Sequence, residues 1–370
     1  MFSEELEKID WEKITKAIYS KTEHDVLRAL GKEHCDVDDF MALISPAAAK
    51  YLEPMAQLSK RYTEERFGKT ISMFIPLYIT NSCTNSCVYC GFHISNPMAR
   101  TILTPEQIED EYKAIKRLGP FENLLLVTGE NPAKAGVPYL AKALDIAKKY
   151  FSNLKIEVMP LKAEEYAELK EHGLNGVICF QETYNKARYN IYHPRGMKSK
   201  FEWRVNSFDR MGQAGVHSIG MGVLIGLEEW RTDVTMMAYH LRYLQKKYWK
   251  TKYSVNFPRM RRHEDGRVAR DVAGLLRGSL TAHETAEAPE IDVLSTYLGC
   301  TNPLQQRLDD TCDHFTLQTR LSGNLLDDLC FCHKCCILMF VIFAKIAIFS
   351  STGNSVSPFF PGCISNSTQE

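Results

Sequence analysis

Three closely spaced cysteines are the residues of this chain that point most directly to a chemistry. Cys83, Cys87 and Cys90 form a C-x3-C-x2-C triplet that directly follows the apolar run Ile71–Ile79. Four thiolates would saturate a zinc ion or an iron–sulfur cluster, whereas three leave one position open. On a [4Fe–4S] cluster the open position is an iron that can bind a small molecule. Two simpler interpretations are a zinc site with a fourth ligand from elsewhere in the chain, and cysteines that are merely buried.

The sequence around the triplet resembles the radical S-adenosylmethionine (SAM) superfamily. The resemblance lies in the cysteine spacing and in Tyr89, the aromatic residue before the third cysteine, which is followed by Gly91 and Phe92. It implies that the open iron binds SAM and that the cluster reduces SAM to a 5′-deoxyadenosyl radical. Tyr89 and Phe92 would then shield the cluster or contact the edge of the adenine. Packing within the loop is the alternative role for both.

A glycine followed by a carboxylate marks the end of a second apolar run. Gly129 lets the backbone approach a ligand closely, and Glu130 supplies the carboxylate. The ammonium group of a bound SAM needs acceptors, because a buried cation requires a partner. We therefore expect Gly129 and Glu130 to bind the cofactor, with a carboxylate at the start of a helix as the alternative.

Further polar residues lie within or close to the later apolar runs. Glu157 lies within the third run, and Gln181 and Glu182 directly follow the fourth. Charged residues within buried strands usually line a polar pocket or pair internally. Arg204 precedes the fifth run, where it can hold a carboxylate through two hydrogen bonds or lie on the surface. We expect these four residues to bind the cofactor.

The last two candidates are a glycine and an arginine. Gly222 lies in the glycine-containing segment Gly220–Gly226 of the fifth run. Glycines within a strand mark a close approach of backbone, which an adenine ring lying flat or helix–strand packing would explain. Arg259 ends the sixth run and is expected to point into the mouth of the fold, where it can serve SAM or a substrate carboxylate.

The elements that must position these residues alternate between apolar runs and amphipathic segments such as Glu106–Leu118, Val137–Tyr150 and Ala163–His172. This alternation predicts an α/β fold with a parallel sheet. Six such units are most of a (β/α)8 barrel of the TIM type, which places its chemistry at the carboxyl ends of its strands. A doubly wound sheet is the alternative. The expected strands are Ile71–Ile79, Asn123–Thr128, Lys155–Met159, Gly176–Phe180, Ser218–Ile225 and Tyr253–Phe257.

Composition and charge disfavour several classes of protein. The 45 Lys and Arg residues balance the 45 Asp and Glu residues, so no overall field indicates nucleic acid or a membrane surface. The segment Met1–Glu7 is acidic and lacks the features of a signal peptide. The 12 cysteines are unevenly spread, which favours reduced thiols and a cytoplasmic location. Residues 1–70 are expected to form a helical extension, in which Ser45 and Pro46 begin a helix over Ala47–Tyr62.

Residues 1–261 as a whole resemble the 2-iminoacetate synthases, the radical SAM tyrosine lyases of thiamine thiazole biosynthesis. The matching segments, which include the cysteine loop, are spread over the first 261 residues. They are Tyr51–Gln57, Pro76–Tyr78, Cys83–Phe92, Leu124–Glu130, Gln181–Tyr184, Trp203–Arg204, Asp209–Arg210, Ala214–Gly215, Leu224–Leu227 and Tyr253–Arg261.

This resemblance implies a reaction and its partners. Cys83, Cys87 and Cys90 would hold the [4Fe–4S] cluster, and the deoxyadenosyl radical would take hydrogen from the amino group of L-tyrosine. The Cα–Cβ bond then breaks, which gives 2-iminoacetate (dehydroglycine) and p-cresol. The implied partners are thiazole synthase, the sulfur carrier protein and a reductant such as flavodoxin or ferredoxin.

The chain departs from this family after about residue 262. The Ser-Thr-Arg-Glu and Ser-Ala-Gly segments of the last two barrel strands are absent, and Leu280–Thr285 is a poor substitute. We therefore expect residues 71–262 to form the barrel core, with its last strands missing or disrupted. Residues 263–370 are expected to be an atypical region, frameshifted or disordered. We hypothesise that a frameshift or an error in the gene model replaced the native segment.

Three other interpretations stay open. One is the related tyrosine lyase of [FeFe]-hydrogenase maturation, whose longer C-terminal domain carries a second cluster; Cys330–Cys336 invites that reading. The second is a non-catalytic iron–sulfur or zinc protein. The third is a membrane-tethered protein that uses Ile337–Phe349, although this run includes Lys345 and is shorter than the roughly 20 apolar residues that a span requires.

Overall fold

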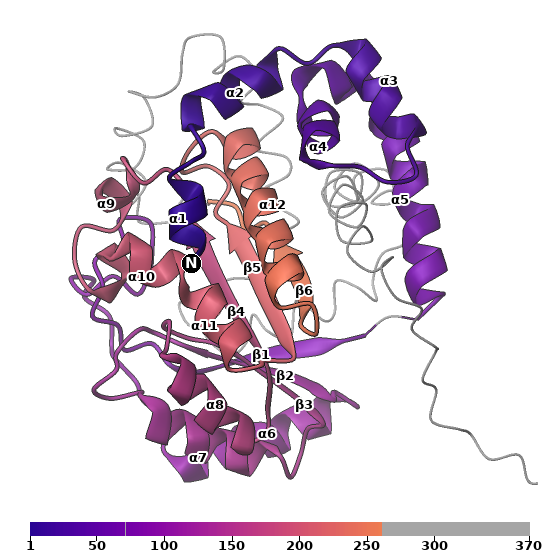
Figure 1. Cartoon of the computed structure of the whole chain (residues 1–370). Coiled ribbons are helices and arrows are strands. Elements are labelled where there is room, and N and C mark those ends of the chain that lie inside the picture. The colour runs from indigo at the N-terminus through magenta and orange to yellow at the C-terminus, as the bar shows by residue number, and fades with distance from the viewer. Residues whose placement is uncertain (71, 261–370) are drawn as a thin grey trace, which may run out of the picture.

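The computed structural model describes residues 1–70 and 72–260, and their central element is a parallel sheet (Figure 1). The sheet has six strands within these residues, and each strand pairs with the next one along the chain. All five pairings are parallel. The strands are β1 (Phe74–Thr80), β2 (Asn123–Thr128), β3 (Asn153–Glu157), β4 (Leu174–Glu182), β5 (Ser218–Val223) and β6 (Lys252–Asn256).

The order β1-β2-β3-β4-β5-β6 identifies the architecture. A doubly wound sheet reverses its strand order at a switch point, and this sheet does not, so the alternative of a doubly wound sheet is wrong. Sequential parallel strands with a helix in each crossover are the pattern of a (β/α)8 barrel. The described residues therefore form six strands of an incomplete barrel, as the sequence predicts.

The strand bounds follow the apolar runs closely, and the difference at the end of the fourth run has a consequence for the site. The run predicted to end at Phe180 continues as a strand through Glu182. The pairing of β4 with β5 shifts between Phe180 and Glu182, which indicates a bulge. Gln181 and Glu182 are thus the last residues of a strand rather than the first residues of a loop. The fifth strand ends at Val223, two residues earlier than predicted.

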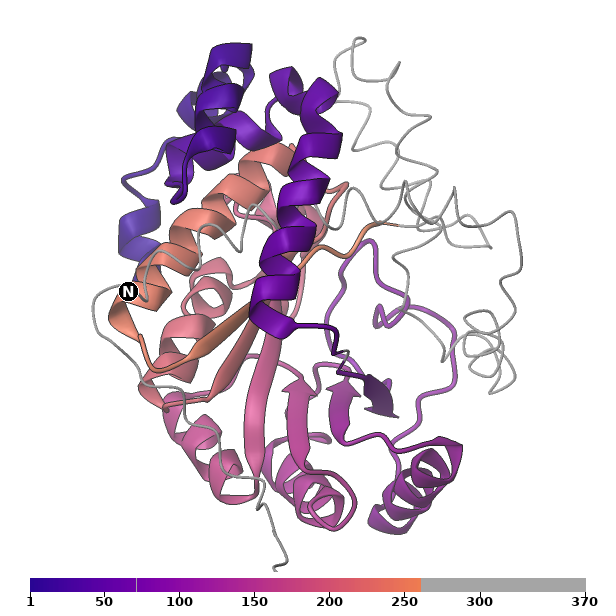
Figure 2. The same ribbon diagram turned by 90° about the vertical axis from the view of Figure 1, so that its right-hand side faces the viewer.

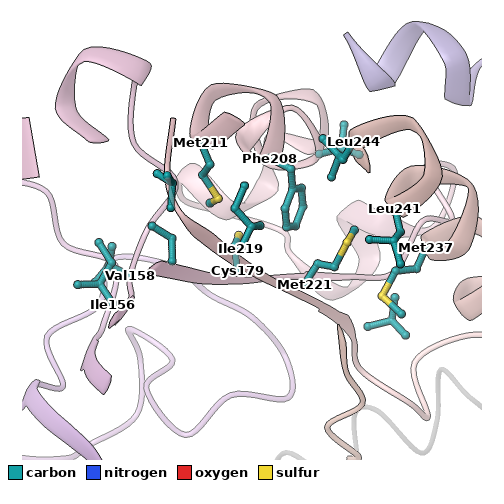
Figure 3. Close-up of a cluster of buried hydrophobic side chains, with 14 of the residues drawn as sticks. Ile156, Val158, Cys179, Phe208, Met211, Ile219, Met221, Met237, Leu241 and Leu244 are labelled. Atoms are coloured by element: carbon teal, nitrogen blue, oxygen red, sulfur yellow. The ribbon is translucent and has the colours of Figure 1, made fainter. Parts of the chain in front are cut away.

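Helices cover the outer face of the sheet and form its main core (Figure 2). Alternate strand residues point toward them, and those labelled in Figure 3 include Ile156, Cys179, Ile219 and Met221, which face Phe208 and other residues of the helices. The crossover helices are α6 (Pro105–Leu118), α7 (Val137–Ala147), α8 (Ala163–Glu171), α9 (Tyr189–Tyr192), the 3-10 helix η2 (Met197–Ser199), α10 (Phe201–Val205), α11 (Ser207–Gln213) and α12 (Trp230–Lys247).

The N-terminal region is helical and packs against α12. Thr15 hydrogen-bonds Thr232, and the guanidinium of Arg231 donates to the backbone oxygen of Ile44. Phe2 is buried with its ring stacked on His240. The elements are α1 (Phe2–Leu6), α2 (Trp11–Tyr19), α3 (Glu23–Gly31), α4 (Val37–Ile44), the 3-10 helix η1 (Pro46–Tyr51) and α5 (Leu52–Phe67).

The helix predicted over Ala47–Tyr62 is divided in the structure. Pro46 begins the 3-10 helix η1, and an α-helix begins only at Leu52. Pro54 explains the break, because proline has no N–H and its ring clashes with the carbonyl four residues earlier in a continuous helix. Ser45 is the N-cap residue and Pro46 lies in the first turn, as predicted, although of η1 rather than of an α-helix. The Ser45 hydroxyl donates to the oxygen of Ala42 and caps no N–H group of η1.

Several predictions lie outside the described residues. These are the atypical region 263–370 with the Cys330–Cys336 segment and the apolar run Ile337–Phe349. Within residues 1–70 and 72–260, no helix combines the length and the apolar composition that a membrane span needs.

Candidate active site at the carboxyl ends of the strands

The three cysteines lie in the loop that leaves the carboxyl end of β1. Cys87 is buried, whereas Cys83 and Cys90 are partly exposed, and all three are free thiols. Two backbone turns shape the loop, since the N–H of Cys90 donates to the oxygen of Cys87 at 3.2 Å and the N–H of His93 donates to Cys90 at 3.0 Å. The loop therefore presents three thiols at the edge of the sheet where parallel α/β folds place their chemistry.

The loop after β2 holds the start of the cysteine loop. The N–H of Thr84 donates to the backbone oxygen of Glu130 at 3.0 Å, and the amide of Asn131 donates to the hydroxyl of Ser82 at 2.8 Å. Gly129 is needed for this approach. A Cβ atom there would lie 2.3 Å from the backbone oxygen of Ser82 and 3.1 Å from the Cβ of Cys83. The predicted close approach at Gly129 is thus to the cysteine loop itself.

The segment between β4 and α10 holds the rest of the cysteine loop. The N–H of Val88 donates to the oxygen of Tyr192 at 3.1 Å, and the N–H of Ser86 donates to Arg195 at 3.3 Å. The hydroxyl of Tyr89 hydrogen-bonds Nε2 of His193 at 2.7 Å. This contact fixes the aromatic ring that lies between the second and third cysteines.

Phe92 and Arg100 stabilise the far side of the loop. The Phe92 ring meets the Tyr78 ring of β1 edge-on, with 6.1 Å between the centroids. The guanidinium of Arg100 donates to the backbone oxygens of Asn81, Phe92 and His93 at 2.9, 3.1 and 2.6 Å. The cysteine loop is therefore held in place by the loop after β2, by the segment between β4 and α10, and by Arg100. These contacts pre-organise the thiols for a ligand.

The chemistry of the thiols fits a metal cluster. Burial raises the pKa of Cys87 to about 12 and also raises the pKa of Cys90. Thiols in this state stay protonated at neutral pH unless a cation stabilises the thiolate. Metal binding supplies that stabilisation and releases the protons. The cysteine loop thus has free sulfur donors that iron would convert into ligands.

Within the described residues, no group of three or more His, Cys, Asp or Glu side chains is arranged to hold a single metal ion. A cluster makes a different demand from a single ion, because each cysteine binds a different iron.

A buried ion pair lies next to the cysteine loop. Arg204 of α10 donates from Nη1 to Oε1 of Glu130 at 2.8 Å and from Nε to the backbone oxygen of Phe180 at 2.6 Å. The amide of Asn85 donates to the other carboxylate oxygen of Glu130 at 2.7 Å. Although burial acts to raise it, Arg204 and Lys198 hold the pKa of Glu130 below its usual value. Glu130 is therefore a carboxylate with both oxygens already oriented.

A second buried pair joins the end of β4 to η2. Lys198 Nζ lies 2.6 Å from Oε1 of Glu182, and both side chains are about nine-tenths buried. Glu182 is the one non-glycine residue of the described chain with positive φ, at 72°. Such strain is concentrated at functional sites, where the surrounding structure enforces it. The register shift at Phe180 and Glu182 coincides with this strained residue, whose carboxylate holds Lys198.

Comparison with known proteins assigns this edge of the sheet to a family. Residues 77–237 match the model of the radical SAM superfamily. Over 261 residues the chain is 49% identical to the 2-iminoacetate synthases of Salmonella typhimurium and of Escherichia coli K12, which covers 70% of this chain and 69% of each relative. The chain belongs to the 2-iminoacetate synthase family of radical SAM enzymes. The interpretation drawn from the cysteine loop and the later segments is confirmed.

Solved structures agree with this assignment. HydG, a maturase of the [FeFe]-hydrogenase, superimposes with a TM-score of 0.66 at 26% identity, and the match covers 70% of this chain and 60% of that protein. Methylornithine synthase (PylB) superimposes with a TM-score of 0.52 at 21% identity, which supports the barrel fold alone. As a radical SAM enzyme, the chain uses a [4Fe–4S] cluster and SAM as cofactors.

Glu157 lies at the end of β3, on the inner face of this radical SAM barrel. It is level with Val127 on one side and Ile178 on the other. Burial and the nearby charge of Glu182 raise its pKa to about 7. The inner face therefore holds a carboxyl group that exchanges a proton near neutral pH, close to the two ion pairs.

The remaining predicted residues have different surroundings. Gln181 is fully buried, and its amide donates to the backbone oxygen of Thr183 at 3.3 Å. A Cβ atom at Gly222 would lie 2.4 Å from the oxygen of Asn256 and 2.6 Å from the ring of Phe180, so strand packing already explains this glycine. Arg259 lies beyond β6, where it forms a parallel bridge with Ile225.

The structure adds residues that sequence reasoning missed. Lys198, Asn85 and His193 contact the cysteine loop or the carboxylates beside it. Asn85 had a usable signal, because it lies between the first two cysteines. Lys198 and His193 lie in a polar segment without periodicity, and their burial depends on contacts with residues far away in the sequence.

Proposed function

We propose that this chain is the radical SAM lyase that cleaves the Cα–Cβ bond of L-tyrosine to give 2-iminoacetate and p-cresol, for the thiazole moiety of thiamine. SAM is converted to methionine and 5′-deoxyadenosine in the same turnover. The observation that carries the proposal is the 49% identity to 2-iminoacetate synthases across the part of the chain that contains the cysteine loop.

Cys83, Cys87 and Cys90 would hold the cluster through their thiolates. When bound, the cluster supplies the electron that cleaves SAM. The protein's part is to position the reactants and to exclude water. Two buried ion pairs lie beside the cysteine loop, where the cluster would bind. They are Glu130–Arg204 and Glu182–Lys198.

The remaining candidates are proposed to bind SAM next to these two ion pairs. Glu130, Glu157 and Glu182 supply carboxylates suited to its ammonium group, and Arg204 is a cation suited to its carboxylate. The other residues would contact its adenine, its ribose or the cluster; they are Tyr89, Phe92, Gly129, Gln181, Gly222 and Arg259.

Partners and location follow from the same family assignment. We propose that the chain hands its imine product to thiazole synthase together with the sulfur carrier protein. Flavodoxin or ferredoxin would supply the electron, and the cytoplasm would be the location. Residues 1–70 are proposed to be the helical extension and 71–262 the barrel core. For residues 263–370 we propose a replaced segment, and translation of the gene after codon 262 in the other two frames tests this.

An anaerobic assay tests the proposed reaction. The reconstituted full chain is incubated with SAM, tyrosine and a strong reductant, and 5′-deoxyadenosine and p-cresol are quantified together. Both products are expected from a complete tyrosine lyase. Deoxyadenosine without p-cresol would mean that the SAM site works and that the tyrosine site is incomplete. Absence of both products, with the cluster assembled, would contradict the proposal.

The similarity to HydG supports a second candidate, the tyrosine lyase of [FeFe]-hydrogenase maturation. The two candidates differ in iron content, because the maturase carries a second cluster. Iron and sulfide equivalent to one [4Fe–4S] cluster per chain favour the thiamine enzyme, and twice that amount favours the maturase.

A further inference from the structure

Lys198 is a buried cation whose role is not explained by the cysteine ligands. Its side chain is 12% exposed, and its ammonium group pairs with Glu182, which is 8% exposed. Removing a lysine from water is costly unless the charge is paired and hydrogen-bonded, and an apolar pair of similar size is often as stable. The position of this charge is therefore more informative than its contribution to stability.

The backbone places Lys198 directly against the cysteine loop. Its N–H donates to Oδ1 of Asn85 at 3.1 Å. Gly196, with φ at 93°, allows this approach, because a Cβ atom there would lie 2.1 Å from the same oxygen. The ammonium group lies 5.7 Å from the ring centroid of Tyr89, the residue just before the third cysteine. Both the main chain and the side chain of Lys198 thus face the loop that carries the thiols.

Lys198 is the member of the ion pair that contacts the cysteine loop, through the side chain of Asn85 and the ring of Tyr89. The carboxylate of Glu182 lies on its ammonium group at 2.6 Å. The ion pair therefore presents its positive charge to the cysteine loop.

We propose that Lys198 raises the reduction potential of the cluster, and that Glu182 limits this increase. The inference rests on the proposed ligation by Cys83, Cys87 and Cys90. Reduction adds one electron from an external low-potential donor and breaks no bond, so the bound cluster becomes more negative by one charge. A fixed cation nearby stabilises the reduced form more than the oxidised form, and charge near the sulfurs is one of the known determinants of cluster potential.

The test is a redox titration of the reconstituted full chain, without SAM, followed by electron paramagnetic resonance. Lys198→Met is expected to lower the equilibrium constant for reduction about tenfold, which equals about 59 mV for one electron. Lys200→Met is the matched control. It changes the net charge equally and lies two residues away, but Lys200 is exposed, where solvent and salt screen its charge. Its potential should equal that of the parent chain.

Glu182→Gln gives a second measurement that does not depend on the folding of Lys198→Met. It removes a negative charge and leaves Lys198 in place, so the potential should rise. A merely structural pair would not give shifts of opposite sign. The inference is overturned if the parent, Lys198→Met and Lys200→Met chains have equal potentials. It is also overturned if Lys198→Met and Glu182→Gln shift the potential in the same direction. Either result would leave the proposed function intact. A parent chain that assembles no cluster would contradict the proposed function as well.

Discussion

The outer face of the sheet and its carboxyl edge are built from the same strands with opposite chemistry. On the outer face, Leu126, Ile156 and Ile219 are fully buried against helices. At the carboxyl edge, buried charges meet in the pairs Glu130–Arg204 and Glu182–Lys198. Both regions exclude water, but one does so with apolar surface and the other with charges that must find partners.

This difference separates stability from function. Apolar contacts are non-directional and stabilise roughly in proportion to the area buried. A buried ion pair gains little over an apolar pair, but removing one partner is strongly destabilising because the other charge is left alone. The outer face therefore contributes most of the free energy of folding. The buried charges at the carboxyl edge contribute little to it, and they keep charged groups beside the cysteine loop.

The largest expected difference between the two regions is the effect on the cluster of replacing a buried cysteine. Cys87→Ala should abolish cluster assembly and both products, because it removes a ligand. Cys179→Ala is the matched control, since Cys179 is also buried but faces Ser207 of α11 on the outer face. It should keep the full iron and sulfide content. Iron and sulfide analysis of the two variants after reconstitution checks this, and equal cluster loss in both would contradict the division between the regions.

Breaking the Glu130–Arg204 pair should give the largest change in the free energy of unfolding. Arg204→Met leaves the Glu130 carboxylate buried without its cation and should destabilise the chain by about 3–5 kcal/mol. Urea unfolding of chains without cluster measures this. Adding Glu130→Gln to Arg204→Met should restore part of the loss.

A surface pair on the same helix serves as the control for that prediction. Lys186 pairs with Glu202 of α10 at 2.7 Å, and both side chains are about half exposed. Lys186→Met should change the free energy of unfolding by less than about 1 kcal/mol, since exposed pairs are screened by solvent. An equal loss in Arg204→Met and Lys186→Met would show that burial of the pair at the carboxyl edge has no special effect.

A cavity in the outer face should be destabilising without affecting the cluster. Leu126→Ala removes a fully buried side chain of β2 and should cost about 2–5 kcal/mol. Leu118→Ala, at a side chain that is 64% exposed, should stay within about 0.5 kcal/mol of the parent chain. Urea unfolding measures both variants, and the cluster potential of Leu126→Ala should match the parent. A shifted potential would show that the two regions are coupled.

The smallest expected effect is a pH dependence at Glu157. Its pKa is raised from 4.5 to about 7 in the folded chain, so the folded state holds a proton that the unfolded state releases. Stability from this group is therefore present below pH 4.5 and is lost as pH rises to about 7. Glu157→Gln should remove this loss and stabilise the chain above pH 7 by roughly 1–3 kcal/mol. Unfolding at pH 4.5 and pH 8 measures the difference, and parallel pH profiles of the parent and Glu157→Gln would contradict it.

Local sequence patterns were sufficient to predict the strands and the cysteine loop. The apolar runs match the observed strands because the strand residues that face the helices are apolar, as the alternation in β3 shows, and this is a property of neighbouring residues. The break before Leu52 was missed, although Pro54 was a local signal for it. The extension of β4 to Glu182 was missed because a bulge depends on pairing with β5.

Lys198 in η2 and Lys200 at its C-terminal end show what the sequence left open. By itself the sequence determined that three thiols follow the first strand and that carboxylates lie at or just after the ends of the second, third and fourth strands. The sequence did not distinguish Lys198 from Lys200, which lie two positions apart in the same polar segment. Only the tertiary structure decided that one is buried on Glu182 beside the thiols and the other faces solvent. The physical reason is that burial and pairing of a charge arise from segments far apart in the chain, which no local pattern records.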